Sequence, residues 1–165
     1  MKSLINKNKI DEIIVTFFFV GKIKYAPGTF GSLAALPILF FDSFDICYYS
    51  IFFVVFLFAI SLKPISRYEL INGADHSSIV IDEVIGMLII FSNPFLTLNV
   101  YWVAISFLLF RLFDILKPFP INKINDKKGA LFVIADDLVA GLFSTIILQI
   151  LQVGYRILPF FLKIL

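Results

Sequence analysis

Long apolar runs separated by short polar stretches dominate the sequence. Residues 46–62 and 130–151 are apolar over close to the 20 residues that a helix needs to cross the roughly 30 Å hydrocarbon core of a bilayer. Residues 95–113 form a third such run, which ends before Pro118 and Pro120, residues that cannot continue a helix. The pattern therefore predicts three membrane-spanning helices.

Shorter apolar segments lie between these runs. Residues 33–41 contain Pro37, and residues 79–92 carry two acids near their start. Both segments are too short to span a bilayer, so we expect helices that span it only with their flanks or re-enter it. Either Thr29 or Ser32 suits the cap position before the first of these helices.

The composition agrees with a membrane protein. Of the 165 residues, 60% are hydrophobic and 16% are charged, whereas soluble domains are about half apolar and a quarter charged. Residues 1–20 mix charged and apolar positions, which predicts an amphipathic helix at the membrane surface. We predict one all-α domain over residues 1–165: a compact polytopic membrane bundle with short or re-entrant helices.

Basic residues alternate between the loops. The segments around 22–24, 63–67 and 117–128 contain Lys or Arg, whereas the turns at 42–45 and 92–99 contain neither. The positive-inside rule places the basic segments in the cytoplasm. The net charge of +2 gives no indication of a nucleic-acid partner, and none is expected.

Two pairs of adjacent carboxylates interrupt the apolar runs. The segment "IVIDEVIGM" holds Asp82 and Glu83, and "ADDLVAG" holds Asp136 and Asp137. Each pair starts a helix that leaves the predicted cytoplasmic side, so all four acids fall at one depth. Acids within a membrane usually face the protein interior, where they pair or bind something. Hard oxygen ligands without a set of Cys and His favour Mg²⁺.

Helix geometry relates these acids to neighbouring residues. Adjacent helical residues point about 100° apart, so one acid of each pair is expected to face the site while the other reaches a neighbouring helix. Gly86 and Gly141 each follow an acid by four positions, and small residues on that face let helices approach closely. Arg111, Asp114 and Lys117 are spaced by three, which predicts neighbours on one helix face.

Cations at the same depth indicate a phosphorylated lipid as ligand. Lys24 and the "APGTFGS" loop join Arg111 and Lys117 there, and phosphoryl chemistry chiefly needs charge neutralisation and positioning. A cysteine phosphatase is excluded because Phe53, not Arg, stands six positions after Cys47. A histidine-nucleophile lipid phosphatase is excluded because His76 is the single histidine, which we expect to be solvated in its polar loop.

Simpler readings of the same residues stay open at this point. An acid at a helix start can cap the helix or interact with its dipole, and an arginine–aspartate pair can anchor a helix end. A small ion-coupled transporter that uses the acids as an ion site is the main alternative function, and a non-catalytic assembly protein is another. The acids cluster at one face and the chain lacks repeated halves, which disfavours the transporter.

Four segments together carry a family resemblance. "APGTFGSLAALP", "DHSSIVIDEVIGM", "FRLFDILKPFPI" and "ADDLVAG" resemble, in order and spacing, the phosphatidylglycerophosphatase A family over roughly residues 21–141. The resemblance implies a bacterial inner-membrane, Mg²⁺-dependent lipid phosphatase that converts phosphatidylglycerophosphate to phosphatidylglycerol at the cytoplasmic face. The sequence departs from the family at "KKGALF", where paired glycines often precede the last acidic pair.

The resemblance and the residue pattern together give a site hypothesis. The expected catalytic acids are Asp82, Glu83, Asp114, Asp136 and Asp137. The expected metal ligands, for one or two Mg²⁺, are Asp82, Glu83, Asp136 and Asp137. The expected substrate-binding residues are Lys24, Pro27, Gly28, Thr29, Arg111 and Lys117. The attacking group stays open between a water and an aspartate. The expected partners are the lipid substrate and membrane lipids, and Phe-rich faces leave room for a homo-oligomer.

Overall fold

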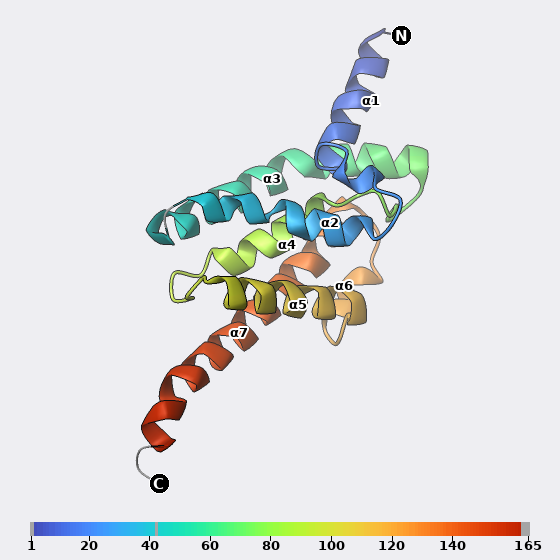
Figure 1. Cartoon of the computed structure of the whole chain (residues 1–165). Coiled ribbons are helices and arrows are strands. Elements are labelled where there is room, and N and C mark those ends of the chain that lie inside the picture. The colour runs from blue at the N-terminus through green and yellow to red at the C-terminus, as the bar shows by residue number, and fades with distance from the viewer. Residues whose placement is uncertain (1, 42, 163–165) are drawn as a thin grey trace.

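A computed structural model of the chain describes residues 2–41 and 43–162 and is shown in Figure 1. Within these residues it contains helices and no strand, which confirms the all-α prediction. The elements are α1 (Lys2–Val15), η1 (Val20–Lys22), α2 (Pro27–Ala34), η2 (Leu36–Phe40), α3 (Ser43–Asn72), α4 (Ile81–Phe91), α5 (Val100–Leu116), α6 (Ile121–Asn125) and α7 (Ala130–Leu162), where η marks a 3₁₀-helix.

Helix α4 lies at the centre of the bundle. Nine of its eleven residues are buried, and it packs against α2, α3, α5 and α7, as the ribbon in Figure 1 shows. The continuous apolar run after Glu83 fits a helix that packs against neighbours on most of its faces. At 1.5 Å per residue α4 is about 16 Å long, too short to cross a bilayer.

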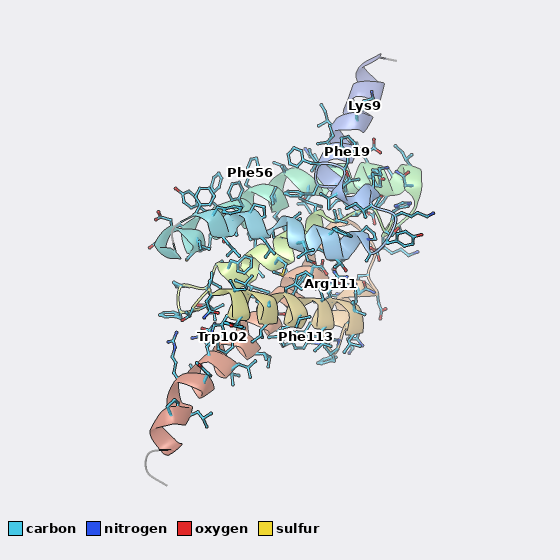
Figure 2. All side chains as sticks on the ribbon, viewed as in Figure 1. Lys9, Phe19, Phe56, Trp102, Arg111 and Phe113 are labelled. Carbon is cyan, nitrogen blue, oxygen red and sulfur yellow. The ribbon has the colours of Figure 1, made fainter. Side chains whose placement is uncertain are left out.

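Two helices are long and apolar enough to cross a membrane. They are residues Asp45–Asn72 in α3 and Ala130–Pro159 in α7. Both expose large apolar side chains to the outside, such as Phe52 and Phe56 on α3; Figure 2 shows Phe56 on the outer side of that helix. Large exposed apolar surfaces of this kind fit hydrocarbon better than water. The structure therefore supports membrane association through α3 and α7.

The third predicted span is shorter than expected. Helix α5 begins at Val100 and not at residue 95, because the Asn99 side chain accepts a hydrogen bond from the Trp102 N–H at 3.0 Å and caps the helix there. The preceding turn is held by Gln152, which accepts from the Thr97 N–H at 2.8 Å and donates to its carbonyl at 2.9 Å. The remaining helix has 17 residues.

The basic segment around 63–67 was expected to belong to a polar loop over residues 63–78, and that expectation is wrong for residues 63–72. Helix α3 continues through Pro64 and ends at Asn72. Ile65 is fully buried, and Arg67 donates two hydrogen bonds to the Asp11 carboxylate of α1, at 2.5 and 2.6 Å. Packing and pairing against α1 stabilise this helical extension despite the proline and the polar sequence.

Helix α2 also starts earlier than predicted. Pro27 occupies its first turn, where proline is favoured because its missing N–H is not needed. Thr29 and Ser32 lie inside the helix, and Ser32 Oγ donates to the Gly28 carbonyl at 2.9 Å, so neither residue is the predicted cap. Three smaller differences concern boundaries. Helix α1 ends at Val15 and not at residue 20, α6 lies within the predicted basic segment 117–128, and α7 continues beyond the predicted end at residue 151.

The closest helix contact joins α4 to α7. A Cβ atom placed on Gly141 would lie 2.3 Å from the Gly86 carbonyl oxygen, and one on Gly86 would lie 2.8 Å from the Asp137 carbonyl oxygen. Both distances are too short for any side chain, so the backbones touch directly. The prediction that these two glycines allow close helix approach is confirmed.

We predict that Gly141→Ala lowers the free energy of unfolding by about 1–3 kcal/mol, because the added methyl group overpacks this crossing. Gly154→Ala is the matched control, since nothing lies within 4 Å of a Cβ at Gly154 in the same helix. That control should be neutral or stabilising by about 0.5–1 kcal/mol. Thermal unfolding of both variants in detergent checks the prediction, and equal midpoints would contradict it.

Candidate active site

A polar cavity of about 340 Å³ opens where α2 and α4 begin, α5 ends and α7 begins. The predicted residues that line it are Asp82, Glu83, Asp114, Asp136, Asp137, Arg111, Lys117, Pro27 and Gly28. These residues come from four helices that are far apart in the sequence. The fold therefore brings all five predicted acids and two of the predicted cations to one place.

Three carboxylates meet inside this cavity. One oxygen from each of Asp82, Glu83 and Asp137 lies within 4.8 Å of the other two. Asp82 is 7% exposed and Asp137 is 3% exposed, so little water screens their charges. Like charges at this spacing repel strongly in a weakly screened interior. The cluster therefore requires a cation or bound protons to be stable.

Asp136 points away from this group, toward the end of α5. Its Oδ2 accepts a hydrogen bond from Lys117 Nζ at 2.5 Å. The predicted divergence of adjacent acids thus holds for Asp136 and Asp137. It fails for the first pair, because Asp82 and the longer side chain of Glu83 both reach the same group from the first turn of α4. Asp136 as a metal ligand stays a prediction.

Arg111 extends from α5 toward α2, as labelled in Figure 2. Its Nη1 donates to Asp114 Oδ2 at 2.5 Å and contacts Ser32 Oγ of α2 at 3.4 Å. The i,i+3 spacing therefore produces the predicted neighbours. Its Nε is buried, and among the described residues it has no hydrogen-bond partner. The guanidinium is thus held in place while part of its donor capacity is left for a ligand.

Lys117 does not pair with Asp114 as the spacing predicted. It ends α5 with φ 42° and ψ 57°, because the proline that follows disfavours the helical conformation. The turn sends its amine to Asp136 and to Asn125 Oδ1. Burial by itself would lower the pKa of Lys117, but the hydrogen bond to Asp136 and the carboxylate charges nearby outweigh it and raise the pKa. Lys117 is therefore a permanent cation in the cavity.

The "APGTFGS" loop meets the cavity at its Pro27–Gly28 end. Gly28 lies against Glu83, since a Cβ there would be 2.2 Å from Glu83 Oε1. Pro27 has no backbone N–H, and the Thr29 N–H donates to the Ala26 carbonyl at 3.0 Å. Thr29 and Lys24 do not line the cavity; the Lys24 amine lies 5.7 Å from the centre of the Tyr25 ring.

Asp75, His76 and Ser77 also line the cavity, and the sequence analysis did not place them there. They belong to the loop before α4, which packs so closely on η1 that a Cβ on Gly21 would lie 2.1 Å from the Ser78 carbonyl oxygen. The signal that could have found them is their position in "DHSS", immediately before the first acidic pair.

Comparison with known proteins addresses the resemblance directly. Residues 13–152 match the family model described as phosphatidylglycerophosphatase A. The chain belongs to this family.

Curated relatives agree with this assignment. A Haemophilus influenzae phosphatidylglycerophosphatase A is 33% identical over 144 residues, covering 85% of this chain and 87% of the relative. The Escherichia coli phosphatidylglycerophosphatase A is 32% identical over 152 residues, covering 89% and 86%. A Bacteroides thetaiotaomicron protein named "Putative phosphatidylinositol-3-phosphatase" is 33% identical over 148 residues, covering 84% and 91%. No solved structure matches the chain.

The acidic cluster of this phosphatidylglycerophosphatase A family member fits a divalent cation. Ligand oxygens of one Mg²⁺ stand about 3–4 Å apart, so the three clustered carboxylate oxygens are close to the required spacing. Glu83 Oε2 and Asp136 Oδ1 are buried, and no hydrogen-bond partner for either lies among the described residues. Buried carboxylate oxygens without donors can be satisfied by a bound cation. The cluster of Asp82, Glu83 and Asp137 could bind a metal.

We predict that Mg²⁺ stabilises the folded protein. A hundredfold excess over the dissociation constant should raise the midpoint of thermal unfolding by about 5–10 °C. Asp137→Asn should abolish this response, and its metal-free form should be at least as stable as the metal-free wild type because the repulsion is reduced. Asp45→Asn, at the exposed start of α3, should respond as the wild type does. Thermal scans in detergent with Mg²⁺ or EDTA decide; an Asp137→Asn variant that still responds fully would refute the metal assignment.

Proposed function

We propose that this protein hydrolyses the terminal phosphomonoester of phosphatidylglycerophosphate to phosphatidylglycerol and phosphate, with Mg²⁺ as cofactor. The observation that supports the proposal is the joint location of three clustered carboxylates and two held cations in one cavity of a phosphatidylglycerophosphatase A family member. A phosphomonoester carries about two negative charges, which an acidic cavity accepts only when cations are present.

Asp82, Glu83 and Asp137 would hold the Mg²⁺, with Asp136 as a further ligand through its unpaired Oδ1. When bound, Mg²⁺ supplies positive charge that neutralises the phosphate oxygens as phosphoryl transfer proceeds. The chain's own cations do the rest of the binding. Arg111 would donate hydrogen bonds to the phosphate, since its planar group suits phosphate oxygens and Asp114 keeps it oriented.

Lys117 would also bind the phosphate. Its amine has three donors, and two of them are used by Asn125 and Asp136, so one is left for a phosphate oxygen.

In the hydrolysis a new bond forms between a water oxygen and phosphorus, and the bond from phosphorus to the glycerol oxygen breaks. The glycerol oxygen takes up a proton, and a carboxylate of the cluster accepts one from the attacking water. An aspartate as the attacking group remains the alternative.

A second substrate is favoured by one relative. The Bacteroides thetaiotaomicron protein is named for action on a phosphoinositide, so a phosphate on an inositol ring is the competing phosphomonoester. Both lipids present a terminal phosphate separated from the diacylglycerol by a second phosphate. The shared chemistry is a phosphomonoester at the end of a headgroup, and direct comparison of the two lipids distinguishes them.

We predict that the purified protein releases phosphate from phosphatidylglycerophosphate with Mg²⁺ and not with excess EDTA. Asp82→Asn and Asp137→Asn should each lower turnover at least about a thousandfold, because each removes charge that holds the cation, while the protein still accumulates in the membrane. Asp45→Asn serves as the matched control, since it lies outside the cavity.

The same assay with phosphatidylinositol 3-phosphate tests the competing substrate. A higher kcat/KM on phosphatidylinositol 3-phosphate than on phosphatidylglycerophosphate would identify the phosphoinositide as the preferred substrate. The reaction would still be hydrolysis of a phosphomonoester. Near-normal turnover in both carboxylate variants would overturn the metal assignment. Ion flux in proteoliposomes without phosphate release would favour the transporter alternative.

We further propose that the protein is a multi-pass protein of the bacterial cytoplasmic membrane and that the cavity faces the cytoplasm. The basic loop around Lys128 lies at the cavity end of α7, and the uncharged turn at 92–99 contacts the other part of α7 through Gln149 and Gln152. Arg156 of α7 also lies at the far end, where it donates to Thr97 Oγ1. The cavity end carries more basic residues, among them Lys117, Lys127 and Lys128, and this excess supports the orientation.

Cysteine labelling tests the orientation. Cys47 is buried and its thiol donates to the Ser92 carbonyl, so Cys47→Ser should be tolerated as the background. In whole cells a membrane-impermeant maleimide should label Asn99→Cys, and it should label Lys128→Cys only after the cytoplasmic membrane is opened. The reverse pattern would contradict the proposed orientation.

A further inference from the structure

A chain of hydrogen bonds leads from α1 to His76 at the cavity. Lys22 Nζ lies 2.6 Å from Glu12 Oε1 and 3.4 Å from the Tyr68 hydroxyl. The Tyr68 hydroxyl lies 2.8 Å from Ser78 Oγ, which lies 2.8 Å from His76 Nδ1. The chain thus connects a surface ion pair to an imidazole that lines the cavity.

One direction along this chain satisfies every member. An ammonium group has donors and no acceptor, so Lys22 donates to the Tyr68 oxygen. The Tyr68 hydroxyl keeps its own proton and can donate it to Ser78 Oγ, and the Ser78 hydroxyl can donate to His76 Nδ1. The hydrogen bond to Glu12 raises the pKa of Lys22 more than burial lowers it, so this lysine remains charged.

A second hydrogen bond independently makes His76 Nδ1 an acceptor. The Ser78 backbone N–H, which can only donate, points at His76 Nδ1 at 3.2 Å. Nδ1 therefore accepts hydrogen bonds and carries no proton. A neutral imidazole keeps its one proton on the other nitrogen, so the ring is held as the Nε2–H tautomer.

Among the described residues, the cavity offers few donors to a phosphate group. Its lining contains Asp75 besides the five acids already described, and the cations Arg111 and Lys117 are already bonded to Asp114 and Asp136. Each donor that reaches a phosphate oxygen without adding a negative charge is therefore valuable. His76 is partly exposed, with its Nδ1 engaged away from solvent, so Nε2–H is the donor that the ring can offer.

We propose that His76 is a substrate-binding residue that donates its Nε2–H to a phosphate oxygen, and that Lys22, Tyr68 and Ser78 are positioning residues that set its tautomer. This inference rests on the proposed phosphomonoester chemistry of the cavity. It adds a neutral hydrogen-bond donor to the acids and to the two cations, Arg111 and Lys117, that already line the cavity. The proposed role is to orient the phosphate through a hydrogen bond, and it involves no proton transfer.

The single histidine of the chain makes the tautomer directly measurable. With ¹⁵N-histidine labelling in detergent and Mg²⁺, the spectrum contains one imidazole. We expect Nδ1 to give the resonance of an unprotonated nitrogen and Nε2 that of a protonated one, and inorganic phosphate should shift the Nε2 resonance. A proton on Nδ1, or an Nε2 resonance unchanged by phosphate, would overturn the proposal.

Substitutions separate binding from structure. His76→Ala should lower kcat/KM on phosphatidylglycerophosphate roughly 10- to 100-fold, mainly through KM, because a hydrogen bond to a charged group is lost. His76→Gln places an amide N–H near the position of Nε2–H and should recover most of that loss. If both variants lose the same amount of kcat/KM and unfold at a lower temperature, His76 has only a structural role. Wild-type kinetics in His76→Ala would also reject the proposal.

Tyr68→Phe tests the positioning chain. Loss of the hydroxyl frees the Ser78 proton from its fixed direction, so part of the ring population should move to the Nδ1–H tautomer in the ¹⁵N spectrum. Tyr101→Phe, at an exposed position of α5, is the control and should leave the spectrum unchanged. A Tyr68→Phe spectrum identical to that of the wild type would show that Lys22, Tyr68 and Ser78 do not set the tautomer.

The spectra do not depend on turnover. A wild-type protein without activity on phosphatidylglycerophosphate would therefore refute the proposed substrate, and the spectra would still test the role of His76.

Discussion

The direct backbone contact between α4 and α7 sets the position of the other parts of the site. Gly86 and Gly141 let the two helices touch, and the carboxylates of Asp82 and Asp137 lie one helical turn from that contact. A larger separation would place the two acids on different sides of the bundle, where no single cation could neutralise both. The burial of α4 depends on the same contact. A helix of this length is too short to span a bilayer, so longer neighbouring helices have to cover it.

Charge compensation is the second constraint on the cavity. Asp136 and Asp114 have partners in Lys117 and Arg111, so each of these acids is neutralised within the protein. Asp82, Glu83 and Asp137 form the remaining cluster, and buried oxygens of the acidic pairs lack donors among the described residues. Burying uncompensated charge costs far more than any single helix contact contributes. The cluster could therefore bind a cation, while the two paired acids hold Arg111 and Lys117 in place.

The spacing of residues along the sequence correctly predicted features that lie within one helix or between the facing small residues of two helices. It predicted the close approach at Gly86 and Gly141, the Arg111–Asp114 pair and a short helix within residues 79–92, which the structure places at 81–91. It failed where distant segments override local preference. The extension of α3 past Pro64 depends on packing against α1, and the turn of Lys117 toward Asp136 depends on where α7 begins. The loop with His76 reaches the cavity by docking on Gly21, a contact that no local pattern encodes.

The depth of the cavity agrees with the chemistry of a lipid headgroup. Asp137 lies seven residues after the start of α7, or about 10 Å along the helix, and about 33 Å before Pro159. A bilayer has a hydrocarbon core of about 30 Å between interfacial layers several ångströms thick. If α7 crosses such a bilayer with its far end at the opposite surface, Asp137 comes to lie close to the boundary between core and headgroups. A terminal phosphate can then enter the cavity while its acyl chains stay in hydrocarbon, so the substrate need not leave the membrane to react.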